Sequence, residues 1–596
     1  MILHRITIED AHAHLFRVTL TVPQPAAQQR FSMAAWIPGS YLVREFARHV
    51  SAMTASQGKR AVPLQQLDKA TWLAECAGKS PLVVTYLVYA FDTSVRAAFL
   101  NAQRGFFNGT GVFLRVEGRE DQAQQVALPE LPKSWKAATA MPAVKVDAAG
   151  RGTYQAENYD ALVDHPFELG DFWRGHFTAQ GVPHEFVVAG ALPDFDGARL
   201  LADAKRICET EIKFWHAKKK PAHQRYVFML NAVEDGYGGL EHRDSTALIA
   251  ARRDLPQTGA AKDAPLTDGY VTLLGLISHE YFHTWNVKRL KPSEFAPYNY
   301  TQENYTELLW FFEGFTSYYD DLLLLRAGLI EEARYFSLLG KAVSGVLATP
   351  GRKTQSVAQS SFDAWVKYYR ADENTPNATV SYYTKGSLVA LALDLTLRAS
   401  SAGSLDAVMR LLWQRSGAAV GVKLGKGGIT EADVLSALHE VAGRSVAAEF
   451  QAWVHGTDDL PLGKLLKGVG VDVKPQTATM AQRWGLRVSE SALTGSRVTH
   501  VLRGGVAEQA GVSAGDELLA LDGWRLRRLD DALRLVPVGG KGKKSTLWVS
   551  RDQRVIELSV TTPSAAEASA SGGVNLVADP KPEPATLALR KAWLAG

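Results

Sequence analysis

The chain has 596 residues, which is too long for one hydrophobic core, so several domains are expected. A hydrophobic content of 46% with 21% charged residues is typical of a folded, soluble protein, and the net charge of +4 gives no reason to expect nucleic acid as a partner. The two cysteines, Cys76 and Cys208, exclude a disulfide framework, and no apolar stretch has the length of a membrane span or signal peptide. These features predict a cytoplasmic protein without a membrane partner and leave a homo-oligomer open.

Residues 1–185 predict an N-terminal β domain. Short runs of alternating apolar residues, such as 16–22 and 82–89, are separated by turn clusters at 38–40 and 108–111. This pattern is typical of a β-sandwich-like fold.

From about residue 186 the pattern changes to a mixture of strands and helices. We expect a helix through 201–207, followed by strands at 226–230 and 246–249 around a glycine-rich segment. Helices follow, including 388–397 and 406–413. We therefore predict a catalytic domain over 186–465, with an α+β half, a helical half and a cleft between them.

The sequence 278–283 places His279 and His283 four positions apart, with Glu280 beside the first histidine. An apolar run precedes it and Thr267 or Asp268 can cap it, so a buried helix is expected. On a helix the two imidazoles share one face and can bind one Zn²⁺, while Glu280 can reach a water. The alternative is a pair of core histidines hydrogen-bonded to carbonyl groups.

Glu313 is the candidate third metal ligand. The apolar stretch 307–319 is expected to form a second buried helix, in which Glu313 stands alone among aromatic residues and an unpaired carboxylate would be costly. Two histidines and one glutamate are a common ligand set of catalytic zinc. The alternative is a glutamate at the start of a helix, near the surface. Asp320, two turns later on the same face, is a candidate to hydrogen-bond a ligand histidine or is simply solvated.

Residues 466–562 resemble a PDZ domain. The segment 484–488 is similar to a PDZ carboxylate-binding loop, and 504–512 and 515–523 are similar to the PDZ core. Backbone N–H groups at Gly485, Leu486 and Arg487 are therefore candidates to bind a peptide C-terminus, with a purely structural domain as the alternative. Residues 563–596 are expected to form a linker and C-terminal tail with a short helix near the end.

Taken together, the motifs resemble the glycyl aminopeptidases, gluzincin zinc metallopeptidases that carry a PDZ domain and have a catalytic part similar to aminopeptidase N. The resemblance rests on 279–283 followed by 313–316, on 36–41 and 285–290, and on the PDZ-like segment. Two further elements are similar to aminopeptidase N. The segment 238–242 is similar to its Gly-Ala-Met-Glu-Asn strand, and 383–386 to its Tyr-Glu-Lys-Gly element. The chain departs from aminopeptidase N in a gap of 30 positions between His283 and Glu313, in Phe312, and in His242.

The resemblance implies roles for further residues. Glu241 would bind the free α-amine of the substrate, with Gly238 and Gly239 allowing close approach of its backbone. Tyr383 would stabilise the oxyanion, with the adjacent Tyr382 as its competitor. A carboxylate of an ordinary strand or turn is the alternative for Glu241.

The predicted fold is multidomain α+β: an N-terminal β-sandwich-like domain, a thermolysin-like and helical catalytic domain, and a PDZ domain. The predicted function is a zinc aminopeptidase with one Zn²⁺ per chain and Glu280 as general base. Its substrates would be peptides with a free, small N-terminal residue (Gly or Ala, as the resemblance implies), with the PDZ domain modulating access or binding peptide C-termini. The alternatives are an endopeptidase or tripeptidase and a catalytically inactive, peptide-binding adaptor.

Overall fold

The computed structural model describes residues 1–217, 219–221, 223–259, 265–400, 403–416, 427–491, 493–536 and 542–596. It contains two compact units, Met1–Asn304 with Trp413–Ile429 and Tyr305–Leu412 with Thr430–Gly596. The chain is a multidomain α+β protein with a β-rich N-terminal region and a helical region, as predicted. The division into four domains stays a prediction.

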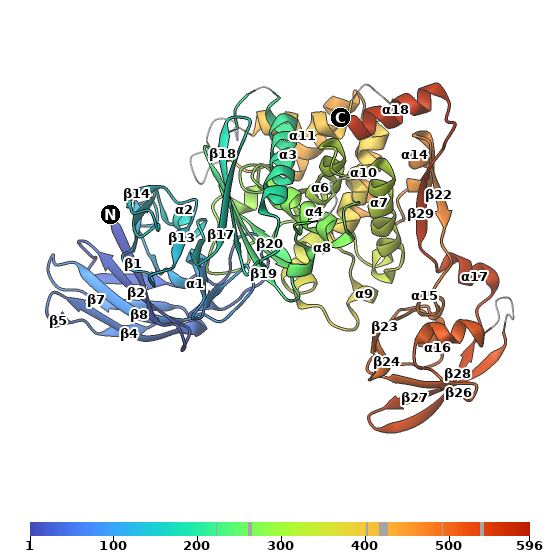
Figure 1. Ribbon diagram of the computed structural model, residues 1–596, viewed down its shortest axis with the longest axis horizontal. Coiled ribbons are helices and arrows are strands. Elements are labelled where there is room, and N and C mark those ends of the chain that lie inside the picture. The colour runs from blue at the N-terminus through green and yellow to red at the C-terminus, as the bar shows by residue number, and fades with distance from the viewer. Residues whose placement is uncertain are drawn as a thin grey trace. The chain divides into compact units, whose positions relative to one another are not determined.

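The N-terminal part of the first unit is built from three sheets (Figure 1). In β2 and β8, buried residues alternate with less buried ones, so each strand turns one face to the core. The eight-stranded sheet has the order β14 (Ala143–Val146), β15 (Gly152–Ala156), β12 (Gln124–Leu128), β1 (Ile2–Asp10), β2 (Leu15–Val22), β8 (Leu82–Tyr89), β4 (Val50–Gln57), β5 (Arg60–Ala61). The four-stranded sheets are β13 (Lys136–Ala138), β16 (Phe167–Gly170), β10 (Arg104–Phe107), β9 (Ala98–Leu100), and β11 (Arg115–Val116), β3 (Gln28–Ser32), β7 (Thr71–Glu75), β6 (Leu64–Gln66).

A five-stranded sheet carries the glycine-rich segment at its edge. Its order is β17 (Trp173–Ala179), β18 (Val182–Ala189), β19 (Tyr226–Val233), β21 (Ser245–Ala251), β20 (Tyr237–Glu241). Strands β18, β19 and β21 are parallel, whereas β20 runs antiparallel to β21. Helices α3 (Gly197–His216) and α4 (Asp268–Phe282) pack on each other, and α4 also packs on β20 and β21. The expected strands and the first expected helix are thus present, with longer bounds.

Helices dominate the first part of the second unit. They include α5 (Leu309–Phe312), α6 (Gly314–Arg326), α7 (Glu332–Leu347), α8 (Val357–Phe362), α9 (Thr375–Ala378), α10 (Thr384–Ser400), α12 (Glu431–Ala442), α13 (Ala447–Phe450) and α14 (Leu462–Gly468). Helices α6, α7 and α10 pack side by side (Figure 1). The helices expected at 388–397 and 406–413 are present as α10 and α11 (Leu405–Arg415). Among the described helices, none alone is long and apolar enough to cross a membrane, and the bent pair α10–α11 meets the criteria only in combination.

The region after α14 contains a six-stranded sheet bracketed by two paired strands. Strand β22 (Val471–Pro475) pairs with β29 (Val574–Ala578), so the segments that enter and leave the six-stranded sheet region lie side by side. Between them lie β23 (Leu486–Ser491), β24 (Gly495–Val501), β25 (Glu517–Leu521), β26 (Trp524–Arg525), β27 (Lys544–Arg551) and β28 (Arg554–Thr561), with helices α15 (Met480–Trp484), α16 (Val506–Gln509) and α17 (Ala565–Ala570). The sheet has its own apolar core. Strand β29 lies in the stretch that was predicted as a linker. Its five residues pair with β22, so this part of the stretch is a strand.

The C-terminal helix α18 (Pro584–Ala595) docks within the second unit. Trp593 is fully buried, and its indole N–H donates to the hydroxyl of Tyr318 on α6 at 2.9 Å. The guanidinium of Arg398 donates to the carbonyl of Ala592 at 2.7 Å. The short terminal helix was expected, and the structure shows it against α6 and α10.

Candidate active site

Helix α4 orients the two histidines toward each other. Thr267 caps it by accepting the backbone N–H of Tyr270, and an apolar run buries it up to Phe282. The Nε2 atoms of His279 and His283 lie 3.1 Å apart. The Nδ1 atom of His283 lies 2.7 Å from the carbonyl oxygen of Asn286, which can only accept a hydrogen bond. Nδ1 therefore carries the proton, and Nε2 of His283 presents its lone pair.

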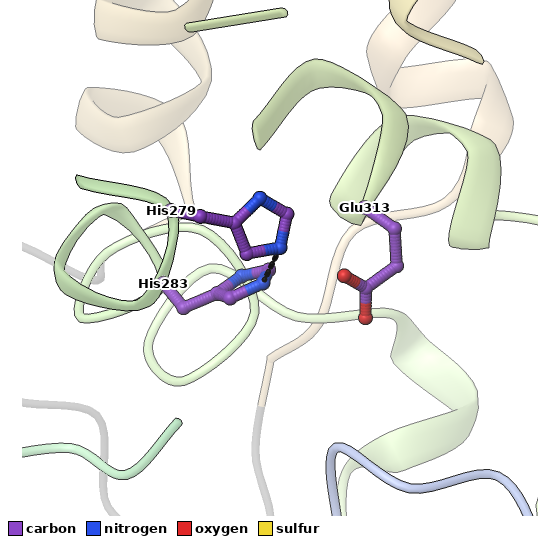
Figure 2. Close-up of side chains that lie close together, drawn as sticks. All are labelled: His279, His283 and Glu313. Carbon is purple, nitrogen blue, oxygen red and sulfur yellow. Dashed lines mark hydrogen bonds between the residues drawn. The ribbon is translucent and has the colours of Figure 1, made fainter. Parts of the chain in front are cut away.

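Glu313 stands at a break between two helices, not inside the single helix expected from the sequence. Helix α5 ends at Phe312 and α6 begins at Gly314, with Glu313 between them and only 2% exposed. His279, His283 and Glu313 each offer one ligand atom, and these atoms all lie within 4.8 Å of one another (Figure 2).

This donor set suits a divalent cation such as Zn²⁺. Tetrahedral coordination at the usual Zn–N distances separates two ligand nitrogens by about 3.3 Å, close to the distance between the two Nε2 atoms. Two imidazole nitrogens and one buried carboxylate also have the ligand chemistry that zinc prefers. The residues present therefore fit a zinc ion.

Glu280 packs directly against the edge strand. Glu280 is 5% exposed, and its side chain faces Gly239 on β20. A Cβ atom on Gly239 would lie 2.5 Å from Cγ of Glu280 and closer still to Cδ and Oε1, which is nearer than real Cβ atoms approach other atoms. A side chain at position 239 would therefore displace the carboxylate of Glu280 from its position.

We expect Gly239→Ala to lower kcat about 10- to 100-fold, because the added methyl group displaces Glu280 from its position. The measurement is kcat together with bound metal, which should be unchanged. The matched control is Gly345→Ala on α7, where an added Cβ meets no atom within 4 Å. Equal kcat in wild type and Gly239→Ala would contradict this role.

Glu241 ends β20, is 4% exposed, and lies against a turn of the N-terminal region. A Cβ atom on Gly39 would lie 2.5 Å from its Oε2 atom, and Gly39 has a φ of +92°, which favours glycine. A hydrogen bond holds this turn in place, because the indole N–H of Trp36 donates to the carbonyl of Asn299 at 2.7 Å. The segment 36–41 therefore forms a wall beside Glu241. Gly238, with a φ of +151°, lies on the same strand, and its role in the approach of a substrate backbone stays a prediction.

Two glycines bring Glu313 and Tyr383 together. A Cβ atom on Gly314 would lie 2.6 Å from Cα of Gly386, so α6 and α10 touch backbone to backbone. Tyr383 directly precedes α10, and burial raises the pKa of its hydroxyl well above the usual value, with a further contribution from the charge of Glu313. The neighbouring Tyr382 is fully buried, whereas Tyr383 is half-buried. Tyr383 is thus the better placed of the two to meet a substrate.

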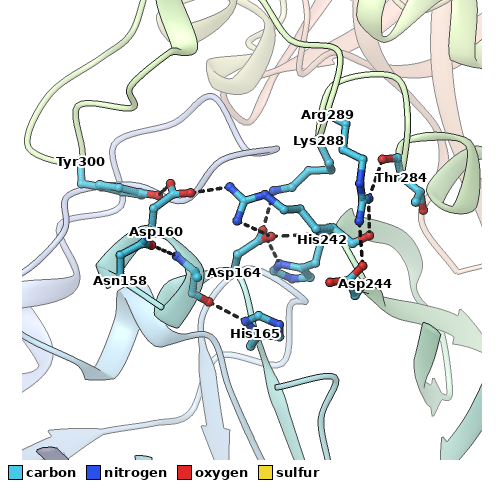
Figure 3. Close-up of polar contacts among 12 residues, drawn as sticks. Asn158, Asp160, Asp164, His165, His242, Asp244, Thr284, Lys288, Arg289 and Tyr300 are labelled. Carbon is cyan, nitrogen blue, oxygen red and sulfur yellow. Dashed lines mark hydrogen bonds and ion pairs between the residues drawn. The ribbon is translucent and has the colours of Figure 1, made fainter. Parts of the chain in front are cut away.

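A buried polar network holds the loop that follows α4 (Figure 3). Lys288 Nζ lies 2.7 Å from Oδ1 of Asp164, and the ring of His242 lies 3.3 Å from the same oxygen. Arg289 donates to Oδ1 of Asp244 at 2.8 Å. Burial lowers the pKa of His242 to about 4, so its ring is neutral at pH 7. The network fixes the end of β20, and with it Glu241, to the N-terminal region.

We expect Lys288→Met to reduce the free energy of unfolding by about 3–5 kcal/mol at pH 7, since it leaves Asp164 buried and charged. Burial alone would raise the pKa of Asp164, but Lys288 and Arg243 bring it well below its usual value. Asp164 therefore stabilises the fold above about pH 4, and this contribution is lost as the pH falls through the folded-state pKa. Urea unfolding measures the loss. The half-exposed control, Lys205→Met, should change stability by less than about 1 kcal/mol, and an equal loss in both variants would contradict the assignment.

The other predicted residues lie elsewhere in the second unit. Asp320 is half-buried on α6, where its Oδ1 accepts the N–H of Asp321 at 2.6 Å, and its role near a ligand histidine stays a prediction. Gly485 is the C-cap residue of α15, Leu486 and Arg487 begin β23, and all three line a cavity.

Sequence reasoning gave no role to several residues that shape the site. Gly39, Gly314 and Gly386 act through close backbone approach, and Asp164 acts through the pairing described above. The sequence did point to the three glycines indirectly, since each lies in a segment that carries the family resemblance.

The arrangement fits one class of protein, the metal-dependent peptidases. Comparison with known proteins shows which family within this class the chain resembles. The model of the peptidase M61 N-terminal domain matches residues 4–171, and that of M61 glycyl aminopeptidase matches residues 272–389. A crystal structure of an aminopeptidase N family protein from Idiomarina loihiensis is 37% identical, covers 100% of both chains and has a TM-score of 0.91.

Two more distant structures also match. A mutant M1 zinc metallopeptidase from Deinococcus radiodurans, bound to Tyr-Ser-Ala, is 13% identical, with 77% of this chain and 94% of that chain covered at a TM-score of 0.46. Legionella pneumophila aminopeptidase A, in complex with aspartic acid, is 12% identical, with 94% and 57% covered at a TM-score of 0.48. No curated protein matches the chain significantly. The chain belongs to the M61 glycyl aminopeptidase family, and this membership supports a metallo-aminopeptidase.

Proposed function

We propose that the protein is a zinc-dependent aminopeptidase that removes a small N-terminal residue, Gly or Ala, from peptides. The observation that carries the proposal is the grouping of His279, His283 and Glu313 as candidate ligands, with Glu280 on the same helix as both histidines. A bound Zn²⁺ would supply Lewis-acid chemistry and lower the pKa of a water molecule at the site.

In this proposal the protein's own groups move the protons and bind the charges. Glu280 takes a proton from the attacking water and passes it to the leaving amine. The hydroxyl of Tyr383 donates a hydrogen bond to the oxyanion of the tetrahedral intermediate; its raised pKa supports a hydroxyl that stays protonated throughout the neutral range.

Glu241 pairs with the α-ammonium group of the substrate and so sets which bond is cleaved. The wall formed by 36–41 limits the room beside it, which supports a small N-terminal residue. The six-stranded sheet after α14 is proposed to be a PDZ domain that modulates access or binds peptide C-termini at Gly485, Leu486 and Arg487.

We expect Glu241→Gln to lower kcat/KM about 10- to 100-fold on substrates with a free α-amine, because the charge-assisted pairing is lost. The control is Glu234→Gln, an exposed residue just before the same strand. An unchanged kcat/KM for Glu241→Gln would remove Glu241 from the amine site.

The proposal is tested with a panel of aminoacyl-amidocoumarin substrates and with peptides that are free or acetylated at the N-terminus, each with and without chelator. Glycyl and alanyl substrates should be cleaved best, acetylated peptides not at all, and chelator should abolish cleavage. Undiminished cleavage of acetylated peptides would favour the endopeptidase, and the absence of all cleavage would favour the adaptor.

A further inference from the structure

The guanidinium group of Arg96 carries a positive charge that no other residue neutralises. Among the residues that the structure describes, this group takes part in no hydrogen bond and no ion pair, and its Nε atom is buried. The side chain is half-buried, in the loop between β8 and β9. A partly buried cation without a partner is unfavourable, and an anion bound from solution would relieve this cost.

This cation lies against the edge strand of the five-stranded sheet. A Cβ atom on Gly238 of β20 would lie 3.7 Å from Nη2 and 3.8 Å from Nη1 of Arg96. Because Gly238 has no side chain, the guanidinium group faces the backbone of β20 directly. Both residues belong to the first unit.

A buried amide holds the backbone on both sides of Arg96. Nδ2 of Asn108 donates to the carbonyl of Val95 at 2.8 Å and to the carbonyl of Ala97 at 3.2 Å. Asn108 is fully buried, so water does not compete for these two bonds. The backbone of Arg96 is therefore held in place before any ligand binds, which lowers the entropy cost of binding.

Strand β20 has one side on which a peptide can add. It is the edge strand, and among the described strands only β21 pairs with it. The end at Glu241 is closed, since the next residue, His242, is buried and paired with Asp164. The other end is open, with Tyr237 63% exposed. A peptide whose α-amine lies at Glu241 would therefore run along β20 toward Gly238.

The spacing along β20 matches a peptide of three residues. Glu241 and Gly238 are three positions apart, which is about 10 Å in an extended strand. An extended tripeptide spans about the same distance from its α-nitrogen to its terminal carboxylate. Glu280 packs on Gly239, between these two positions, on the side of the first peptide bond. A strand added to β20 lies about 4.8 Å from it, so its carboxylate is within reach of Arg96.

We propose that Arg96 binds the C-terminal carboxylate of a tripeptide and thereby makes peptides of this length the preferred substrates. A dipeptide ends about 3.4 Å short of the cation, and a tetrapeptide carries its carboxylate about 3.4 Å past it. A carboxylate suits the planar guanidinium group better than a neutral carbonyl does, because it accepts two charge-assisted hydrogen bonds. The preferred substrate length rests on the proposed aminopeptidase function, whereas the carboxylate site itself does not.

The test compares Ala-Ala-Ala with its C-terminal amide as substrates of the full chain, with the initial rate of alanine release as the readout. In the wild type, kcat/KM for the acid should exceed that for the amide about tenfold or more. Ala-Ala and Ala-Ala-Ala-Ala should each be cleaved less efficiently than Ala-Ala-Ala. Equal kcat/KM for acid and amide, or no preference for three residues, would overturn the proposal.

Variants test whether Arg96 is the source of this preference. Arg96→Met removes the charge and should reduce the ratio of kcat/KM between acid and amide to about one. Both substrates report on the same sample, so a partial loss of folded protein cancels in this ratio. Arg96→Lys, which keeps the charge and loses the paired donors, should give an intermediate ratio and serves as a second variant should Arg96→Met not fold.

The matched control is Arg60→Met, at an exposed arginine on β5, which should keep the full ratio. The wild-type ratio in Arg96→Met, or its loss in Arg60→Met as well, would overturn the assignment to Arg96.

The two proposals fail in different ways. Calorimetry on the Glu280→Gln chain measures binding of Ala-Ala-Ala and of its amide without appreciable turnover. A chain that hydrolyses no substrate, yet binds the acid more tightly than the amide only while Arg96 is present, contradicts the proposed aminopeptidase and leaves the carboxylate site standing. A chain that cleaves alanyl substrates in a metal-dependent manner and treats acid and amide alike contradicts only this inference.

Discussion

Glu280→Gln should lower kcat about 10³-fold while bound zinc and the free energy of unfolding stay close to wild type. The amide cannot take a proton from water, and removal of a general base typically costs two to four orders of magnitude. The side chain keeps its shape against Gly239, so its neighbours should not move. Steady-state kinetics on an alanyl substrate, with metal analysis of the same sample, measures the effect.

The matched control for this variant is Glu294→Gln, a surface glutamate shortly after α4. It should leave kcat unchanged. If Glu280→Gln retained more than about a tenth of wild-type kcat with its zinc in place, another group would have to be the base.

The second large effect is expected for Tyr383→Phe, with kcat reduced about 10²- to 10³-fold and KM nearly unchanged. The hydroxyl is proposed to interact with the oxyanion, which exists only during the reaction, so its loss raises the barrier without weakening substrate binding. Because the pKa of Tyr383 lies well above its usual value, the loss should be the same across the neutral pH range.

Tyr305→Phe, at an exposed tyrosine in the same unit, is the control and should behave as wild type. A rise in KM at constant kcat would show that Tyr383 binds the substrate in its ground state and would contradict the oxyanion role. Tyr382→Phe, at the fully buried neighbour, should affect kcat much less than Tyr383→Phe.

The metal helix was the part of the site most open to prediction, for a physical reason. Two histidines four positions apart share a helix face whatever the rest of the fold does, and an apolar run up to Phe282 already indicates a buried helix. The β-rich N-terminal region was equally predictable, because the alternation of buried and less buried residues along β2 and β8 follows from the local sequence. Glu313 was predicted as a ligand, but its place at a break between α5 and α6 was not.

Features that depend on distant parts of the chain could not be predicted in this way. The contact of Gly39 with Glu241 joins residues 202 positions apart, and no local pattern specifies it. The pairing of β22 with β29 likewise joins strands on either side of the whole six-stranded sheet. The ion pair between Lys288 and Asp164 explains why a lysine is tolerated in an apolar region, yet its partner lies 124 positions earlier.

Metal analysis of the purified chain, combined with activity before and after chelation, tests the central claim most directly. We expect one zinc per chain, loss of aminopeptidase activity when the metal is removed, and recovery when zinc is restored. Glu313→Gln should bind zinc more weakly than wild type under the same conditions. Full activity on a substrate with a free α-amine after complete removal of metal would contradict the account.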